Sequence, residues 1–133
     1  MTRHFTIMTA ALALGLAAPA AHASQPDQAA HQNCFPAGPA WQSWSAAENG
    51  DVLYLRVHIN DIYRVDLRPG SHVYKNSSYF LVNRVRGSNW ICSALDLDLT
   101  LAGDYGYRKP LIAVSMRKLT PEEAAAIPRK ERP

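Results

Sequence analysis

The clearest pattern in the chain is an alternation of apolar and polar residues between Leu53 and Leu67. Successive side chains leave opposite faces of a β-strand, so an alternation with period two predicts strands. The alternation breaks around Asn60-Asp61, two residue types that favour turns. The stretch Asp51–Arg68 therefore predicts two antiparallel strands on which the later strands pack. The residues expected on the buried face are Leu53, Leu55, Val57, Ile59, Tyr63, Val65 and Leu67.

The register of this hairpin depends on the length of its loop. A two-residue turn would bring charged residues onto the buried face, because a slip of one residue exchanges the two faces. A loop of residues 60–62 avoids this slip and pairs Arg56 with Asp66. A five-residue loop keeps the same faces but sets Arg56 opposite Arg64. We expect the three-residue loop, since an opposite-charge pair across two strands contributes roughly 0.2–1 kcal/mol.

Other segments also have the composition of strands, separated by clusters of glycine, asparagine and serine. The first of them should pair with the hairpin through the turn Glu48–Asp51. In the segment 95–101 four leucines are expected to point inward, and in the last segment Ile112, Val114 and Met116. The segments are Trp41–Ala46, Tyr79–Arg86, Trp90–Cys92 followed by Leu95–Leu101, and Leu111–Arg117.

A short helix is predicted near the end of the chain, over Pro121–Ile127. Thr120 is a favourable N-cap, proline suits the first helical position, and Glu123 completes a capping box. The proline at position 128 ends the helix. Taken together, the segments predict an all-β fold, a small antiparallel barrel or sandwich of five to seven short strands with a short C-terminal helix.

The N-terminal region has the features of a secretory signal peptide over residues 1–23. Arg3 precedes an apolar run, and Ala21-His22-Ala23 is a small-x-small cleavage site. The alternative is that the apolar run remains as an uncleaved anchor. Cleavage after Ala23 would leave about 110 residues, enough for one domain, in a periplasmic or secreted protein. No other stretch is apolar over the roughly 20 residues that a membrane span requires.

The expected domain organisation follows from composition. Residues 24–40 are a flexible leader, 41–127 a single β-rich domain and 128–133 a polar tail. The formal net charge of the 133-residue chain is only +3 and its basic residues are scattered, so we expect no nucleic acid partner. Cys34 and Cys92 are the two cysteines. An even number in an exported chain indicates a disulfide, and the alternative is two separate thiols.

The residues offer little for catalysis or for binding of a metal or cofactor. The histidines beyond the signal peptide, at positions 31, 58 and 72, are not spaced as metal ligands. Asp96 and Asp98 share a face of a predicted strand, and we interpret them as solvated. No glycine-rich phosphate loop and no nucleophile motif is present. We therefore expect no catalytic, metal or cofactor site.

Aromatic and basic residues form the remaining candidate, a surface for a glycan or an envelope protein. The alternative is that the rings fill the ends of a small barrel. The candidate residues are Trp41, Trp44, Tyr105, Tyr107, Arg108 and Lys109. The last four lie in the segment 102–109, which we expect to be a protruding loop.

The chain resembles a family of small exported bacterial proteins known only as a domain of unknown function. The resemblance rests on the order and spacing of several short motifs between residues 34 and 123: Cys34-Phe35, Leu53–Val57, Tyr63–Leu67, Arg86, Ser88, Trp90–Cys92, Ile112 and Leu119–Glu123. It implies export, a β-rich fold and bacterial origin, but no catalytic residues. Members often have two more cysteines, near Ser71 and Pro110 here. The joint absence of both is what a lost disulfide would leave, and it supports pairing of the two that remain.

Three functional hypotheses remain. The first is a non-enzymatic periplasmic or secreted domain that acts by binding or as a structural component of the envelope. The second is an inhibitor or accessory protein of an envelope enzyme, which needs a protruding loop. The third is a small cell-envelope hydrolase, which needs a concave site with converging titratable groups.

Overall fold

The computed structural model describes residues 33–37 and 41–133. The signal peptide, the cleavage after Ala23 and most of the leader therefore lie outside the described residues. In chain order the elements are β1 (Phe35–Pro36), β2 (Trp41–Ala46), β3 (Val52–Val57), β4 (Asp61–Leu67), β5 (Tyr79–Asn83), β6 (Trp90–Ile91), η1 (Ala94–Asp96), β7 (Leu99–Gly103), η2 (Asp104–Gly106), β8 (Arg108–Leu111), β9 (Ala113–Lys118), α2 (Pro121–Ala126) and η3 (Arg129–Glu131).

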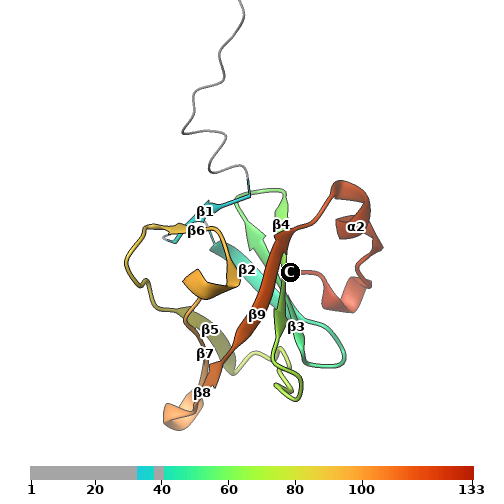
Figure 1. The fold of residues 1–133 in the computed structure, drawn as a ribbon. Coiled ribbons are helices and arrows are strands. Elements are labelled where there is room, and N and C mark those ends of the chain that lie inside the picture. Colours follow the sequence, from blue (N-terminus) through green and yellow to red (C-terminus); the bar gives the residue numbers. More distant parts are fainter. Residues whose placement is uncertain (1–32, 38–40) are drawn as a thin grey trace, which may run out of the picture.

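The strands form three antiparallel sheets, with orders β2-β3-β4-β9, β5-β7-β8 and β1-β6 (Figure 1). Only Ile112 separates β8 from β9, so one bent segment joins the two larger sheets. The predicted all-β class with a short C-terminal helix is confirmed, although the strands outnumber the predicted five to seven. The number is higher because Ile112 divides one long segment into β8 and β9, and because the two-residue segments β1 and β6 count as strands.

The predicted hairpin is present as β3 and β4, but its predicted register is wrong. Tyr63 pairs with Leu55, and Arg56 lies opposite Ile62 instead of Asp66. The loop consists of residues 58–60, and its first residue, His58, has a φ of 55°. Ile59, expected inside, is 80 % exposed in this loop. The other predicted inward residues of the hairpin are buried, because a shift by an even number of residues keeps the same faces.

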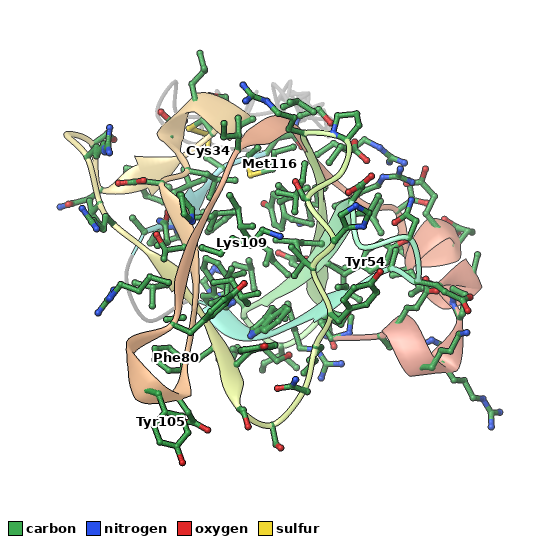
Figure 2. The ribbon with its side chains drawn as sticks, turned by 90° about the horizontal axis from the view of Figure 1, so that it is seen from below. Cys34, Tyr54, Phe80, Tyr105, Lys109 and Met116 are labelled. Atoms are coloured by element: carbon green, nitrogen blue, oxygen red, sulfur yellow. A yellow bond between two sulfur atoms is a disulfide. The ribbon has the colours of Figure 1, made fainter. Side chains whose placement is uncertain are left out.

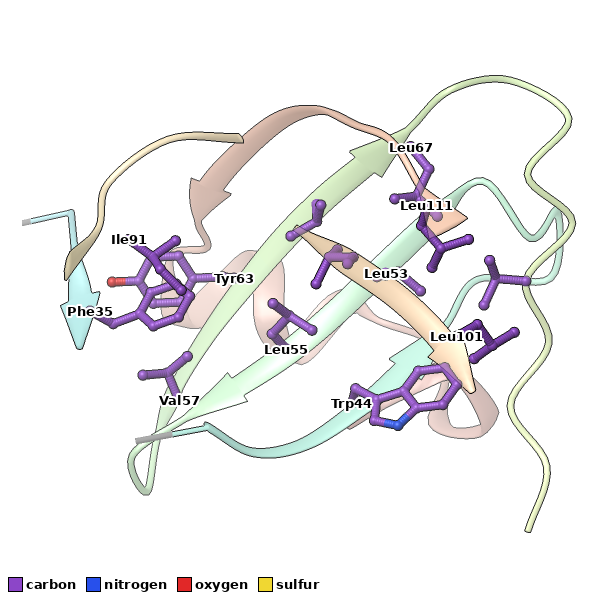
Figure 3. Packing of buried hydrophobic residues seen from close by; sticks show 13 residues of the cluster. Phe35, Trp44, Leu53, Leu55, Val57, Tyr63, Leu67, Ile91, Leu101 and Leu111 are labelled. Atoms are coloured by element: carbon purple, nitrogen blue, oxygen red, sulfur yellow. The ribbon is translucent and has the colours of Figure 1, made fainter. Parts of the chain in front are cut away.

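The main core lies between the two larger sheets. Leu53, Leu55 and Val57 of β3 are fully buried in it. Figure 3 shows Trp44 and Leu101 at one end of this cluster and the Phe35 and Tyr63 rings at the other. The two rings pack edge to face with their centroids 4.7 Å apart. A full burial of one such apolar side chain contributes about 1.5–3 kcal/mol, so this cluster is the main source of stability.

The short pair β1-β6 holds the beginning of the described chain to this core. Cys34–Pro36 therefore belong to the packed structure and not to the flexible leader predicted for residues 24–40. Phe35 pairs with Ile91, and both side chains are 1 % exposed. The predicted disulfide between Cys34 and Cys92 is confirmed directly beside this pair. The disulfide therefore reinforces the same strand pair that the side chains of Phe35 and Ile91 attach to the core.

The inward residues predicted for the last strand are partly wrong. Ile112 and Val114 are 47 % and 57 % exposed. The register between β4 and β9 shifts between Asp66 and Leu67, so that both Ala113 and Met116 pack against the core. A bulge of one residue reverses the alternation on its two sides. A strict period of two could not reveal this reversal.

The alternation of residues 95–101 does not form one strand. Leu95 lies in η1 and is 95 % exposed, and β7 begins only at Leu99. The Asp96 carboxylate accepts hydrogen bonds from the backbone N–H groups of Cys92 and Ser93, at 3.0 and 2.9 Å. Asp96 is thus an element of a capped turn and not a residue of a strand face. This local capping, next to the disulfide, replaces the predicted strand geometry.

The predicted C-terminal helix is confirmed as α2, and it covers the outer face of the sheet β2-β3-β4-β9. The Thr120 side chain accepts a hydrogen bond from the backbone of Glu123, and the capping box is complete. Beyond the helix, Ile127 packs with Val52 and Tyr54. Neither residue is among those expected on the buried face of the hairpin, and the helix segment buries both.

Residues 128–133 were predicted as a polar tail, but they form part of the packed structure. They include η3, in which Glu131 is buried. The Glu131 carboxylate accepts a hydrogen bond of 3.1 Å from the backbone N–H of Glu48, and its carbonyl accepts one from the Ser45 hydroxyl. The Pro133 carbonyl accepts one from Arg56. Polar composition concealed these contacts because each partner is distant in the sequence.

Asp51 organises the loop after β4. Its carboxylate accepts hydrogen bonds from the backbone N–H groups of Gly70 and Ser71, at 3.0 and 2.7 Å. The hydrogen bond from Gly70, followed by those of His72 and Ser71, lowers the pKa of Asp51 below its ordinary value of 3.8. The lowered pKa means that the charged form is better stabilised in the folded state than in the unfolded chain.

We expect this carboxylate to make folding sensitive to acid. A group with a depressed folded pKa contributes stability above its unfolded pKa, and this contribution is lost as pH falls from about 4 through the folded value. Asp51→Asn should therefore flatten the fall in unfolding free energy below pH 4. The measurement is urea denaturation at pH values from 7 to 2. An equally steep fall in the variant would contradict the assignment to Asp51.

None of the helices in the described ranges has the length and apolar character needed to cross a bilayer.

Candidate functional site

The β7–β8 hairpin carries a projecting turn with a fully exposed aromatic ring. The turn is η2, and in both Figure 1 and Figure 2 it extends from one end of the molecule. Its closing hydrogen bond joins the Gly103 N–H to the Tyr107 carbonyl at 2.9 Å. Tyr105 at the tip has a φ of 55° and is completely exposed to solvent. For a bulky residue this left-handed conformation costs roughly 1–2 kcal/mol.

Further aromatic residues surround the base of this turn. Tyr79 and Tyr107 have ring centroids 5.4 Å apart. The Tyr79 ring lies so close to Gly103 that a Cβ there would approach it to 2.7 Å. On the other face of the sheet, Phe80 is 54 % exposed, in register with Ala102 and so with Arg108. We call Tyr79, Phe80, Tyr105, Tyr107 and Arg108 the aromatic tip.

The predicted binding surface of six residues divides into two groups. Tyr105, Tyr107 and Arg108 are exposed at the aromatic tip. Trp44 is instead 8 % exposed in the core, where Lys75 lies 5.9 Å from its ring centroid. The other two residues are Trp41 and Lys109.

Trp41 and Lys109 also belong to the packed structure. Trp41 is half-buried against the core cluster. Lys109 is on the inner face of β8, opposite Leu101, and its ammonium donates to the Ser71 carbonyl. The lysine thereby ties β8 to the loop that Asp51 organises. The residue types of Trp41 and Lys109 suit a binding surface, whereas the inner register of β8 directs Lys109 inward.

The aromatic tip also contains two residues that the sequence analysis did not include, Tyr79 and Phe80. They are adjacent on β5, so one of them must face outward in any strand. The alternation of residues 79–83 therefore indicates an outward-facing aromatic residue. Alternation alone does not show that β5 pairs with β7 next to the projecting turn.

The other candidate groups lie apart from the tip. Asp96 caps η1, and the backbone N–H groups of Cys92 and Ser93 hold the pKa of its carboxyl below the ordinary value. Asp98 forms an ion pair of 2.8 Å with Arg86. The two carboxylates therefore have separate partners and do not act as a pair. In the described part of the chain, no three histidine, cysteine or carboxylate side chains lie together as a metal site would require.

The aromatic tip is chemically suited to binding. Exposed rings bury large areas on contact at low entropic cost, and the guanidinium of Arg108 adds hydrogen-bond donors and a positive charge. The turn is short and internally hydrogen-bonded, so Tyr105 is presented on a defined backbone.

Comparison with known proteins adds no further assignment: no protein-family model, no curated protein and no solved structure matches this chain.

Proposed function

We propose that this protein is an exported, non-enzymatic binding domain of the cell envelope, and that it binds through the aromatic tip. The observation that carries the proposal is Tyr105, a fully exposed ring held in a left-handed backbone conformation at a projecting turn. Strain of this kind persists only where the surrounding structure imposes it, and it concentrates at functional sites. Large exposed aromatic side chains are also typical of binding hot spots.

The partner class that suits this surface is a glycan or an envelope protein. Both are recognised by stacking or packing on aromatic rings, with polar groups at the rim. Phe80 on β5, Tyr105 at the turn and Arg108 on β8 supply these two kinds of contact. Export to the periplasm or outside the cell, proposed from residues 1–23, would bring the domain to such partners.

A second function is favoured by the projection of the turn. An inhibitor of an enzyme inserts a narrow, preorganised loop into a concave site, and η2 has this form (Figure 1). We keep an inhibitor or accessory protein of an envelope enzyme as the alternative. The two functions use the same tip and differ only in whether the partner is an enzyme whose activity falls on binding. The aromatic tip contains no carboxylate, histidine, serine or cysteine, so it does not support the hydrolase.

We expect Tyr105→Asn to abolish partner binding without destabilising the fold. Asparagine tolerates the left-handed region better than tyrosine, so the variant should be equally stable or slightly more stable. Binding should fall at least about tenfold, as is typical of a hot-spot residue. The measurement is capture from periplasmic extract by the tagged protein, together with co-sedimentation with purified peptidoglycan.

The matched control is Tyr74→Asn, because Tyr74 is another exposed tyrosine, 56 % accessible, in the loop before β5. This variant should retain the partner or the glycan. If the captured partner is an enzyme, wild-type protein but not Tyr105→Asn should lower its activity under the alternative function. Equal retention by wild type and Tyr105→Asn in both assays would reject the aromatic tip as the binding site.

A further inference from the structure

A pocket with no assigned role lies away from the aromatic tip, between the outer face of the sheet β2-β3-β4-β9 and the segment that contains α2. Its volume is about 270 Å³. Figure 2 places Tyr54 on the side of the sheet that faces this C-terminal segment. The residues that line the pocket are Tyr54, Arg64, Arg117, Leu119, Glu123, Ala126, Ile127 and Pro128.

Three hydrogen-bond donors come from one row across the sheet. Tyr54 of β3 is directly opposite Arg64 of β4, which is directly opposite Arg117 of β9. Residues in such a row point to the same face, so the phenol and both guanidinium groups lie along the pocket. Two arginines placed opposite each other repel, and anionic groups beside them relieve this repulsion.

Both arginines are positioned by carboxylates and still have free donors. Arg64 uses Nε and Nη2 on one oxygen of Asp66, and Arg117 uses Nη1 on Glu123, each at 2.8 Å. A guanidinium has five N–H groups, so each retains donors for another acceptor. Ser115 and the backbone N–H of Thr120 also bind these two carboxylates and help to keep them in place.

The Tyr54 phenol is the third donor. Its side chain is almost buried, at 9 % exposure, under the C-terminal segment. Burial is the main cause that raises the pKa of Tyr54 above its ordinary value of 10, so the hydroxyl keeps its proton at neutral pH. A protonated phenol beside two guanidinium groups donates to an oxyanion and does not compete with it.

The remaining walls and charges restrict the ligand. Leu119 and Ile127 are buried apolar residues, and Ala126 and Pro128 extend the same apolar wall. Glu123 lines the pocket as well, and its negative charge disfavours a doubly charged anion such as hydrogen phosphate. The volume is below the range of roughly 300–1,000 Å³ that is typical of drug-sized ligands. The pocket therefore suits a short apolar body with a single carboxylate.

We propose that this pocket binds a small aliphatic monocarboxylate, with the carboxylate held by Arg64, Arg117 and the Tyr54 hydroxyl and the aliphatic part against Leu119 and Ile127. The proposal is independent of the aromatic tip, which lies on another sheet. Planar guanidinium groups match the geometry of a carboxylate, which explains the selection of this anion.

The test is a titration of the protein, purified after periplasmic expression, with sodium butyrate, followed by backbone amide chemical shifts. Butyrate should cause saturable shifts in residues of the pocket, with a Kd of the order of 1 mM for a ligand of this size. Butyramide, the uncharged analogue, should bind at least about tenfold more weakly. Inorganic phosphate at pH 7.5 should cause no saturable shifts in the pocket.

Two variants test the donors. Tyr54→Phe removes only the hydroxyl and should weaken butyrate binding at least about tenfold, the effect of one hydrogen bond to a charged group. Arg117→Gln combined with Glu123→Gln removes one guanidinium group without changing the net charge. This double variant should bind butyrate at least about tenfold more weakly. The matched control is Arg86→Gln with Asp98→Asn, which removes a remote ion pair of the same length.

Absence of saturable shifts with butyrate would overturn the proposal. Equal binding of butyrate and butyramide, or tighter binding of phosphate, would overturn the assigned ligand class. An unchanged affinity of Tyr54→Phe for butyrate would contradict the role of the Tyr54 hydroxyl. This substitution keeps the ring that packs against the helix segment. Amide spectra of each variant, recorded without ligand, show whether its fold is retained.

Discussion

Replacing both cysteines by serine should lower the free energy of unfolding by about 4 kcal/mol, because the Cys34–Cys92 bond closes a large loop of the unfolded chain. The two residues are separated by 58 positions, and a cross-link over such a distance removes considerable conformational entropy from the unfolded state. In a domain of this size the melting temperature should fall by roughly 15 °C. Urea denaturation and thermal melting, both followed by circular dichroism, measure the change.

The disulfide also stabilises the folded state, because it lies directly beside the short pair β1-β6. β1 and β6 have two residues each, and without the bond they are held by their pairing and by the packing of Phe35 and Ile91 in the core. Wild-type protein in reducing agent should therefore melt like the double variant, and the double variant should be insensitive to reducing agent. A loss below about 1 kcal/mol would show that the link does not restrict the unfolded chain as the entropy model requires.

Gly50→Ala should destabilise the fold by about 3 kcal/mol, since the turn between β2 and β3 has no space for a methyl group. Gly50 has a φ of 72°, and a Cβ at this position would lie 2.7 Å from the backbone nitrogen of Val73. Val73 is fully buried, and its N–H donates to the Gly50 carbonyl at 2.8 Å. The neighbouring chain therefore cannot move away without losing both the packing and the hydrogen bond. Urea denaturation measures the loss.

The control for this substitution is Gly87→Ala. Gly87 has a similar φ of 78°, but a Cβ there meets no atom within 4 Å. The control therefore isolates the cost of the backbone conformation, about 1 kcal/mol. The difference between the two variants measures the steric part at Gly50. Equal losses in the two variants would mean that the contact with Val73 has no energetic effect.

The fold class and most of its elements were predictable because their signals are local. β2, the β3–β4 hairpin and α2 follow from period two, turn residues and a capping box, all of which act within a few neighbouring residues. The disulfide was predictable because the chain contains just two cysteines.

The register of the hairpin was not predictable in the same way. Registers that differ by two residues bury the same face, so alternation cannot distinguish them. The expected partner of Arg56, Asp66, instead bonds to Arg64 of its own strand and to Ser115 of β9. Arg56 in turn donates to the Pro133 carbonyl. Charge pairing between the two strands of the hairpin thus had less influence than contacts with β9 and the C-terminal segment.

The candidate sites likewise combine local features that the sequence predicts with contacts between distant residues that it does not. That Tyr105 and Tyr107 lie in a protruding turn was predictable from the residues between two strands. That Trp44 fills the core, and that Phe80 lies beside the projecting turn, was decided by which sheet each strand joined. The row of Tyr54, Arg64 and Arg117 escaped the sequence analysis entirely, because its members come from three strands and the pocket exists only once α2 covers them.

The sequence by itself therefore determined β2, the β3–β4 hairpin, the capped helix and the cross-link, since each depends on interactions between near neighbours or on a single available partner. The tertiary structure alone decided the register, the bulge opposite Asp66 and Leu67, and the two candidate sites. Each of these depends on side chains that are distant in the sequence and compete for the same face of a sheet. Local periodicity is the same for every outcome of that competition, and only the packing of the whole chain selects one.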